Sequence, residues 1–166
     1  MDLKWKPMWH VEHWREGGLL WENWMGANML HDEGEQFMLE VVFTEVQVPP
    51  VNYYFGLDQR AGTSAEANTL ASLVAEPTGA NGYYRQPIPS ANTSWLVAQI
   101  GGDYRASSSQ GTFAALAAGW GPVDTGFVGT SSNGTGKLIA TVSLGASRTL
   151  IAGDSLNLSM YISLGE

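Results

Sequence analysis

Tryptophan is concentrated at one end of this chain, where five of the seven tryptophans lie within the first 24 residues. They are Trp5, Trp9, Trp14, Trp21 and Trp24. An indole ring hides roughly 150–250 Å² when it is fully packed, and an isolated two-stranded ribbon is only marginally stable in water. A segment this short does not bury five such rings by itself. We therefore expect them to pack on the rest of this protein or on another protein, and we take all five as candidate interface residues.

Composition points to a subunit with neighbours. The 166 residues suit one domain with an additional arm, and only 14% of them are charged, against a usual share of about 25%. Nine of the sixteen acidic residues fall in residues 1–45, together with three basic ones. Binding to nucleic acid needs clustered lysine or arginine, so we expect no nucleic-acid partner.

Several chemistries are excluded by missing residue types. The chain has no cysteine, which removes disulfides, thiolate catalysis and thiolate-bound zinc. The first residues do not have the apolar core of a signal peptide, and no stretch is apolar enough for a membrane span. We therefore expect no membrane partner, and any additional stability has to come from packing or from oligomerisation.

The N-terminal segment, residues 1–48, is predicted to form an arm made of a hairpin and a helix. Residues 9–15 and 19–25 resemble two strands, and Glu16-Gly17-Gly18 is typical of the loop between them. Asp32 is expected to cap a helix, with Glu35 completing a capping box. Apolar residues then recur at helical spacing up to about Glu45, and two prolines at 49 and 50 mark a boundary.

The remainder, residues 51–166, has the pattern of a β-domain. A short helix is predicted over residues 66–75. In the last strand, five apolar residues from Leu156 to Leu164 alternate with polar ones or tyrosine, which predicts one buried and one solvated face. Short strands at this spacing predict a mainly β fold, an antiparallel β-sandwich or a jelly-roll-like barrel, with the hairpin and helix as its N-terminal arm. The predicted strands cover residues 51–57, 83–88, 94–100, 111–116, 122–130, 136–144 and 154–164.

A catalytic or metal site is hard to assemble from these residues. The only histidines are His10, His13 and His31. On a strand, His10 and His13 point to opposite faces and do not share a metal ion. Asp154 stands at a strand end, where turn capping is the simpler role. We therefore expect no enzyme activity, no cofactor and no metal.

Aromatic residues outside the arm leave two interpretations open. Trp95 and Trp120 lie within β-rich stretches, where core packing is favoured over a surface on which sugars stack. Tyrosines also occur as neighbours, at 53 and 54 and again at 83 and 84. One member of each pair should point outwards, and tyrosine is enriched in interfaces. We take Tyr53 and Tyr83 as candidate interface residues.

Several short motifs follow one another in a set order along the chain. They are Trp14–Trp21, Asn28–Gly34 followed by Met38-Leu39, Tyr54–Leu57, Gly82–Gln86, Trp120–Val123, Gly136–Ala140, Arg148–Leu150 and Gly153–Leu156. These motifs are structural and carry no chemistry. Together they resemble a class of small virion proteins of tailed bacteriophages, a resemblance that extends over most of the chain and implies a virion β-sandwich subunit.

The resemblance leads to three functional hypotheses. The first is a non-enzymatic capsid decoration (cement) protein that forms trimers or dimers and anchors through its arm on the major capsid protein or on other virion subunits. The second is a neck, tail or baseplate subunit of the same particle. The third is a receptor- or glycan-binding module. The first two place the protein in the virion, assembled in the host cytoplasm.

Overall fold

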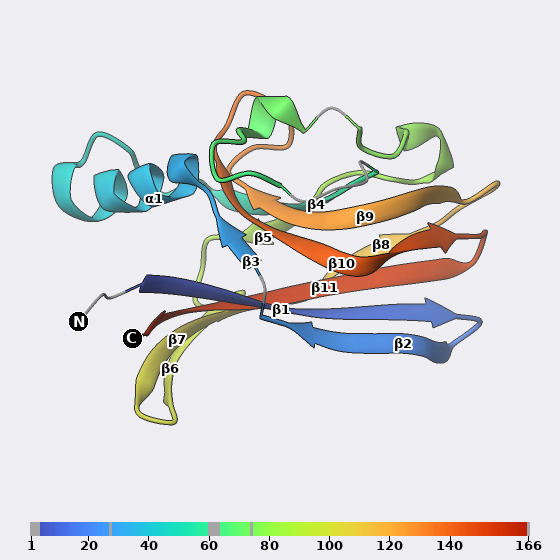
Figure 1. The fold of residues 1–166 in the computed structure, drawn as a ribbon, viewed down its shortest axis with the longest axis horizontal. Coiled ribbons are helices and arrows are strands. Elements are labelled where there is room, and N and C mark those ends of the chain that lie inside the picture. Colours follow the sequence, from blue (N-terminus) through green and yellow to red (C-terminus); the bar gives the residue numbers. More distant parts are fainter. Residues whose placement is uncertain (1–3, 27, 60–63, 74, 166) are drawn as a thin grey trace.

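Two antiparallel β-sheets face each other across a hydrophobic core (Figure 1). The computed structural model describes residues 4–26, 28–59, 64–73 and 75–165. Within them, the first sheet has six strands, ordered β2-β1-β11-β7-β6 with β8 also paired to β11. The second has five, ordered β3-β10-β9-β4-β5. The prediction of a mainly β, antiparallel sandwich is confirmed.

The bounds of the elements are as follows. The first sheet contains β1 (Lys4–Arg15), β2 (Gly18–Met25), β6 (Trp95–Ile100), β7 (Asp103–Ser108), β8 (Gly111–Ala114) and β11 (Asp154–Gly165). The second contains β3 (Asn28–Leu30), β4 (Asn52–Asp58), β5 (Gln86–Pro89), β9 (Trp120–Gly129) and β10 (Leu138–Leu150). The helical elements are α1 (Asp32–Leu39), the π-helical turn η1 (Glu40–Thr44) and two 3₁₀ turns, η2 (Leu70–Ser72) and η3 (Gly79–Asn81).

The N-terminal hairpin is an integral part of the first sheet. Its turn lies at Glu16 and Gly17, both with positive φ, as predicted. Strand β1 pairs with β2 on one side and with β11 on the other, from Lys4 opposite Gly165 to Arg15 opposite Asp154. The expected division into residues 1–48 and 51–166 therefore does not coincide with a break in the sheet, because β1 is an inner strand.

The core lies between the facing sides of the two sheets. Leu156 and Leu158 of β11 are fully buried, and their neighbour Asn157 is partly exposed, as the alternating pattern predicts. From the first sheet, Trp9 packs on Phe55 of the second, with ring centroids 5.3 Å apart. Burying each large apolar side chain is worth about 1.5–3 kcal/mol, so these contacts hold the sheets together.

Helix α1 follows β3 and is fixed to the second sheet at its start. His31, fully buried, is the residue before its first turn, and Nε2 lies 3.0 Å from Thr141 Oγ1 of β10. Gly34 lies so close to β10 that an added Cβ would be 2.5 Å from the Ile139 carbonyl oxygen. Together, α1 and η1 cover the predicted helical stretch. The Asp32 cap is corrected, however, because His31 is the N-cap residue and no side chain caps the turn.

Local predictions fail where tertiary packing replaces the local pattern. The helix predicted over residues 66–75 is reduced to η2, where Leu70 and Leu73 pack in a small cluster with Phe127 and Leu138. Strand β7 was not predicted, because its polar sequence lacks alternation, and β3 is too short to give a signal. The strand expected from residue 83 begins only at Gln86. In the described part of the chain, no helix is long and apolar enough to cross a membrane.

Candidate functional site

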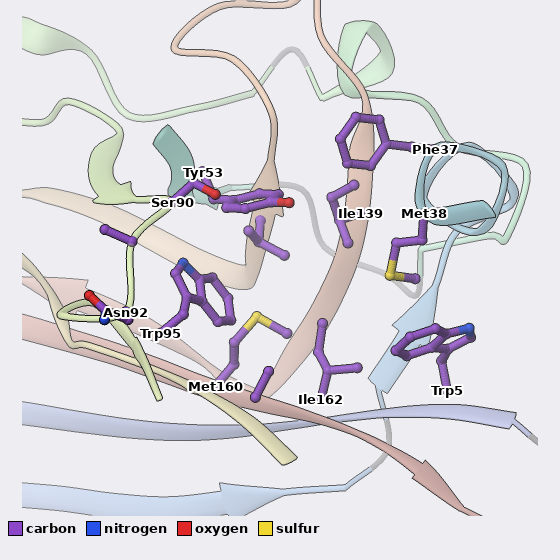
Figure 2. Close-up of a pocket in the computed structure, with 13 residues that line it drawn as sticks. Trp5, Phe37, Met38, Tyr53, Ser90, Asn92, Trp95, Ile139, Met160 and Ile162 are labelled. Carbon is purple, nitrogen blue, oxygen red and sulfur yellow. The ribbon is translucent and has the colours of Figure 1, made fainter. Parts of the chain in front are cut away.

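An apolar cavity of about 410 Å³ opens at one end of the sandwich, between the two sheets (Figure 2). Helix α1 contributes Phe37 and Met38 to its wall. Met160 and Ile162 line it from β11, and Ile139 lines it from β10. A volume of this size is within the range of pockets that hold small ligands, about 300–1,000 Å³. The cavity therefore has room for one or more apolar side chains from a partner.

Aromatic rings form the part of the wall that faces this apolar lining. Tyr53 of β4 and Trp95 of β6 meet edge to face, with ring centroids 5.5 Å apart. Burial raises the pKa of Tyr53, so its hydroxyl stays protonated. The Trp95 Nε1–H is buried and finds no hydrogen-bond partner among the described residues. An unsatisfied buried donor is costly, and this one belongs to a ring of the cavity wall.

Two exposed apolar segments frame the cavity, and we call them the apolar rim. The first, residues 39–51, runs between the lining residues Met38 and Tyr53. The second, residues 96–104, runs between the lining residues Trp95 and Ala106. In Figure 1, α1 and the β6–β7 hairpin both extend toward the side of the molecule where the termini lie. The most exposed large apolar residues of the rim are Leu39, Val42, Phe43, Val46, Val48, Val51, Leu96, Val97, Ile100 and Tyr104.

This concentration of exposed apolar side chains is unusual for a free surface. Phe43 is 76% exposed and Val51 is 85% exposed. The rim carries three acids and no base: Glu40 and Glu45 in residues 39–51, and Asp103 in residues 96–104. A concentration of exposed apolar side chains of this kind marks an interaction site. The cavity end therefore has the properties of a protein-binding surface.

Groups for acid–base or metal chemistry do not converge here. Among the residues that the structure describes, no three histidine, cysteine or acidic side chains are placed to hold a metal ion. Of the residues that line the cavity, Tyr53 is the one with a titratable side chain. His10 and His13 do lie on different sides of β1: His10 contacts Glu22, and His13 is buried against Asp154. The apolar lining of the cavity is suited to an apolar partner.

The five tryptophans of the N-terminal segment differ in their burial and in their contacts. Trp5 lines the cavity and is 36% exposed. Trp24 is 55% exposed and stacks on His10 on the outer face of the first sheet. Trp9 is completely buried in the core. The interface assignment of Trp9 is therefore wrong for this subunit, because its ring already packs on Phe55.

The other two indoles are half-buried within the subunit. Trp14 donates its Nε1–H to a Glu12 carboxylate oxygen at 2.9 Å. Trp21 lies under the guanidinium of Arg148, whose Cζ is 3.7 Å from the ring centroid. Both rings thus have partners in their own chain, and a smaller part of each remains for contact with another molecule.

The two tyrosines that we assign to an interface from the sequence also lie in different environments. Tyr53 lies in the cavity wall. Tyr83 is buried, and its hydroxyl donates to Glu76 Oε2 at 2.7 Å and accepts the Leu57 N–H at 2.9 Å. The exposed member of that pair is Tyr84, so the interface assignment of Tyr83 is corrected. Trp120 packs in the core as favoured, but Trp95 is a cavity residue.

Sequence reasoning missed the apolar rim. Within residues 41–51, the sequence pattern assigns Val41 and Val42 to the apolar side of a helix and Val51 to a strand, and it gives no role to Phe43, Val46 and Val48. A signal was present, because these apolar residues are too many and too closely spaced for one helix face. No local pattern, however, shows that residues 96–104 lie at the same end of the molecule.

The fold and the site together define a β-sandwich protein with an apolar binding end. A family model described as "Podophage GP4 fiber I protein gp80" matches residues 30–161. The chain belongs to this family, which makes it a structural protein of the phage virion. No curated protein matches the chain. The resemblance to virion proteins of tailed phages is thus confirmed at the level of the virion structural protein.

Proposed function

We propose that this protein is a non-enzymatic subunit of a podophage fiber and that it binds another virion protein through the cavity and the apolar rim. The observation that carries the proposal is the gathering of exposed apolar side chains around one open cavity. The family supports it, because its description names a fiber protein. This function corresponds to the tail-type alternative among our hypotheses.

The N-terminal residues 1–48 have a part in this proposal. Trp5 at the cavity and Val42 and Phe43 in the rim place parts of this segment at the binding end. Deleting residues 1–25 is not a usable test of anchoring, because β1 pairs with β11 along its whole length. Substitution of exposed side chains is the appropriate test.

A second position on the particle has its own supporting observation. Leu19 and Leu20, at the tip of the β1–β2 hairpin, are 43% and 53% exposed, and Trp24 on β2 is also exposed. These side chains form a second apolar surface that could anchor the protein on the major capsid protein. The protein would then be a capsid decoration (cement) protein.

Purified virions distinguish the two positions. We expect gold-labelled antibody against this protein to mark the fibers and the copy number to be close to that of the tail proteins. A copy number close to that of the major capsid protein, with label over the shell, would instead identify a decoration protein. Absence from purified virions would overturn both.

Substitution tests the binding surface itself. We expect Val42→Ser to reduce incorporation of the protein into virions, because Val42 is exposed in the rim. Tyr84→Ser is the matched control, since Tyr84 is also 63% exposed but lies outside the rim. Equal incorporation of the two variants would contradict a role for the cavity end.

A further inference from the structure

We infer that Asn133 is a site of self-modification, at which the main-chain nitrogen of Gly134 displaces the side-chain amide and leaves an acidic residue. Asparagine followed by glycine suits this reaction, because glycine has no side chain to hinder its own nitrogen. The pair lies in the exposed loop between β9 and β10. This loop contains no residue that lines the cavity and none of the rim, so the inference is independent of the proposed function.

The reaction has two steps, each with a defined bond change. The Gly134 nitrogen attacks Cγ of Asn133 and forms a five-membered cyclic imide. Its proton passes through solvent to the side-chain nitrogen, which leaves as ammonia. Water then adds to one of the two imide carbonyls and breaks the bond from that carbonyl to nitrogen. The product is aspartate or isoaspartate, and each has a carboxylate that asparagine lacks. Attack within one chain is favoured over a reaction between separate molecules.

Three hydrogen-bond donors converge on the side-chain carbonyl oxygen of Asn133. The Thr135 N–H donates to Oδ1 at 2.9 Å, the Thr135 hydroxyl at 2.6 Å and the Ser131 hydroxyl at 3.0 Å. A main-chain N–H only donates, so the amide atom that it contacts is the oxygen. This oxygen becomes negatively charged when the Gly134 nitrogen attacks, and donors that are already in place stabilise such a charge.

The two nitrogens that react are not held by other groups. Among the residues that the structure describes, neither the Gly134 N–H nor the Asn133 side-chain nitrogen has a hydrogen-bond partner. Both residues are exposed, so water reaches them. The attacking nitrogen and the leaving nitrogen are therefore free, while the oxygen between them is fixed by its donors.

The second Asn-Gly pair of the chain provides an internal comparison. The Gly82 N–H donates to the Gly79 carbonyl at 3.1 Å, and Asn81 Nδ2 donates to the Gly119 carbonyl at 2.7 Å. The attacking nitrogen and the leaving nitrogen are both held there. Within the described part of the chain, no donor contacts Asn81 Oδ1. The reaction therefore belongs to Asn133 and not to Asn81.

Arg85 determines which product is favoured when the ring opens. Its Nη1 donates to the main-chain carbonyl of Asn133 at 2.6 Å, and this contact polarises the carbonyl toward water. Opening at this carbonyl turns it into a carboxylate, and the chain then continues through the former side-chain carbonyl, which is isoaspartate. The new carboxylate pairs with the guanidinium in a charge-assisted hydrogen bond. Isoaspartate is therefore the favoured product in the folded protein.

Peptide mapping by mass spectrometry tests the inference on the intact protein after incubation in mildly alkaline buffer. We expect folded Asn133 to lose its amide about tenfold faster than Asn81, or more, because only Asn133 has the donors. In urea the two rates should become similar. Equal rates in the folded protein would overturn the inference, and so would an Asn133 amide that persists. A difference of the same size in urea would show that the fold has no part in it.

Variants of the loop test the donors and the nucleophile separately. Thr135→Val removes one hydroxyl donor and should slow the reaction about 2- to 10-fold. Gly134→Ala should slow it further, because the added methyl group hinders the nitrogen, although its Cβ would meet Ala71 only at an ordinary 3.7 Å. Ser132→Ala is the matched control, since it removes an exposed hydroxyl of the same loop that is not one of the three donors. Equal rates for Thr135→Val and Ser132→Ala would overturn the role of the donors.

The ratio of the two products tests the role of Arg85. Electron-transfer fragmentation distinguishes isoaspartate from aspartate at Asn133. We expect a larger share of isoaspartate in the folded wild type than in urea, and a smaller share in Arg85→Lys with unchanged circular dichroism. The comparison with urea needs no variant, so it also holds where Arg85→Lys fails to fold. An equal share in the folded and unfolded wild type would overturn this role.

Discussion

His13 on the first strand and Asp154 at the start of the last are joined inside the first sheet, with His13 Nε2 3.1 Å from Asp154 Oδ2. Both side chains are almost completely buried. The same carboxylate accepts two hydrogen bonds from the Arg15 guanidinium, at 2.7 and 2.8 Å, and one from the Ile151 N–H. One residue therefore fixes β1, β11 and the turn before β11.

Removing this carboxylate should destabilise the fold. We expect Asp154→Ala to lower the free energy of unfolding by about 1–3 kcal/mol, because the buried His13 and the Ile151 N–H lose their acceptor. Asp103→Ala, at the exposed start of β7, should change it by less than about 0.5 kcal/mol. Urea denaturation at pH 7 measures both, and equal effects would contradict this role for Asp154.

The same site predicts a loss of stability in acid. Hydrogen bonds from Arg15, with further ones from His13 and the Ile151 N–H, hold the pKa of Asp154 well below its ordinary value of 3.8. A lowered carboxyl pKa stabilises the fold above the ordinary value, and this stabilisation is lost as pH falls below it. We therefore expect the stability difference between wild type and Asp154→Ala to shrink below about pH 4. A difference that stays constant down to pH 2 would refute this linkage.

His31 predicts a second pH effect, at higher pH. Its Nδ1 lies 3.1 Å from the Glu66 carbonyl, which can only accept, so Nδ1 carries the proton and Nε2 accepts from Thr141 Oγ1. Burial lowers the pKa of His31 below its ordinary 6.5. The unfolded chain takes up a proton below that pH while the folded chain does not. Stability should therefore be fully present above pH 6.5 and decrease as pH falls below it.

Urea denaturation at pH 7.5 and 5.5 measures this decrease. His31→Phe removes the titrating group and should flatten the change between the two pH values, even where its overall stability is lower. A change as steep in His31→Phe as in the wild type would assign the effect to other groups.

Gly34 is expected to control the distance between α1 and the second sheet. An alanine there would place its Cβ 2.5 Å from the Ile139 carbonyl oxygen of β10. We expect Gly34→Ala to cost about 1–3 kcal/mol and to reduce the association proposed through the cavity, because α1 supplies part of its wall. Gly79→Ala, whose Cβ meets nothing within 4 Å, is the matched control. Similar melting temperatures for the two variants would argue against this close contact.

The contribution of Arg85 to stability is expected to depend on its guanidinium group. It pairs with Glu76 through Nε and Nη2 and donates Nη1–H to the carbonyls of Ser131 and Asn133. Lysine has no planar fork, so Arg85→Lys should lose about 1–3 kcal/mol of stability. A double-mutant cycle with Glu76→Ala should be non-additive. Additive losses would show that the two side chains act independently.

Hydrophobic periodicity predicts the parts of this fold in which burial follows a repeating local pattern along the chain. The alternation from Leu156 to Leu164 predicts β11 and its buried face, because side chains on a strand alternate between the two sides of the sheet. Glu16-Gly17-Gly18 predicts the first hairpin, because glycine suits a tight turn, and Glu16 and Gly17 do adopt positive φ there. These features depend on local backbone geometry alone.

The candidate site depends on contacts between distant segments and could not be predicted in this way. Trp5, Tyr53, Trp95 and Met160 become neighbours only when β1, β4, β6 and β11 pair in the observed order. Periodicity also does not distinguish Trp9, which the core buries, from Trp24, which remains exposed. The sequence by itself determined a β-sandwich that is rich in aromatic residues suited to packing and to interfaces. Only the tertiary structure decided which rings are buried and where the cavity opens, because strand order brings together residues that no local pattern connects.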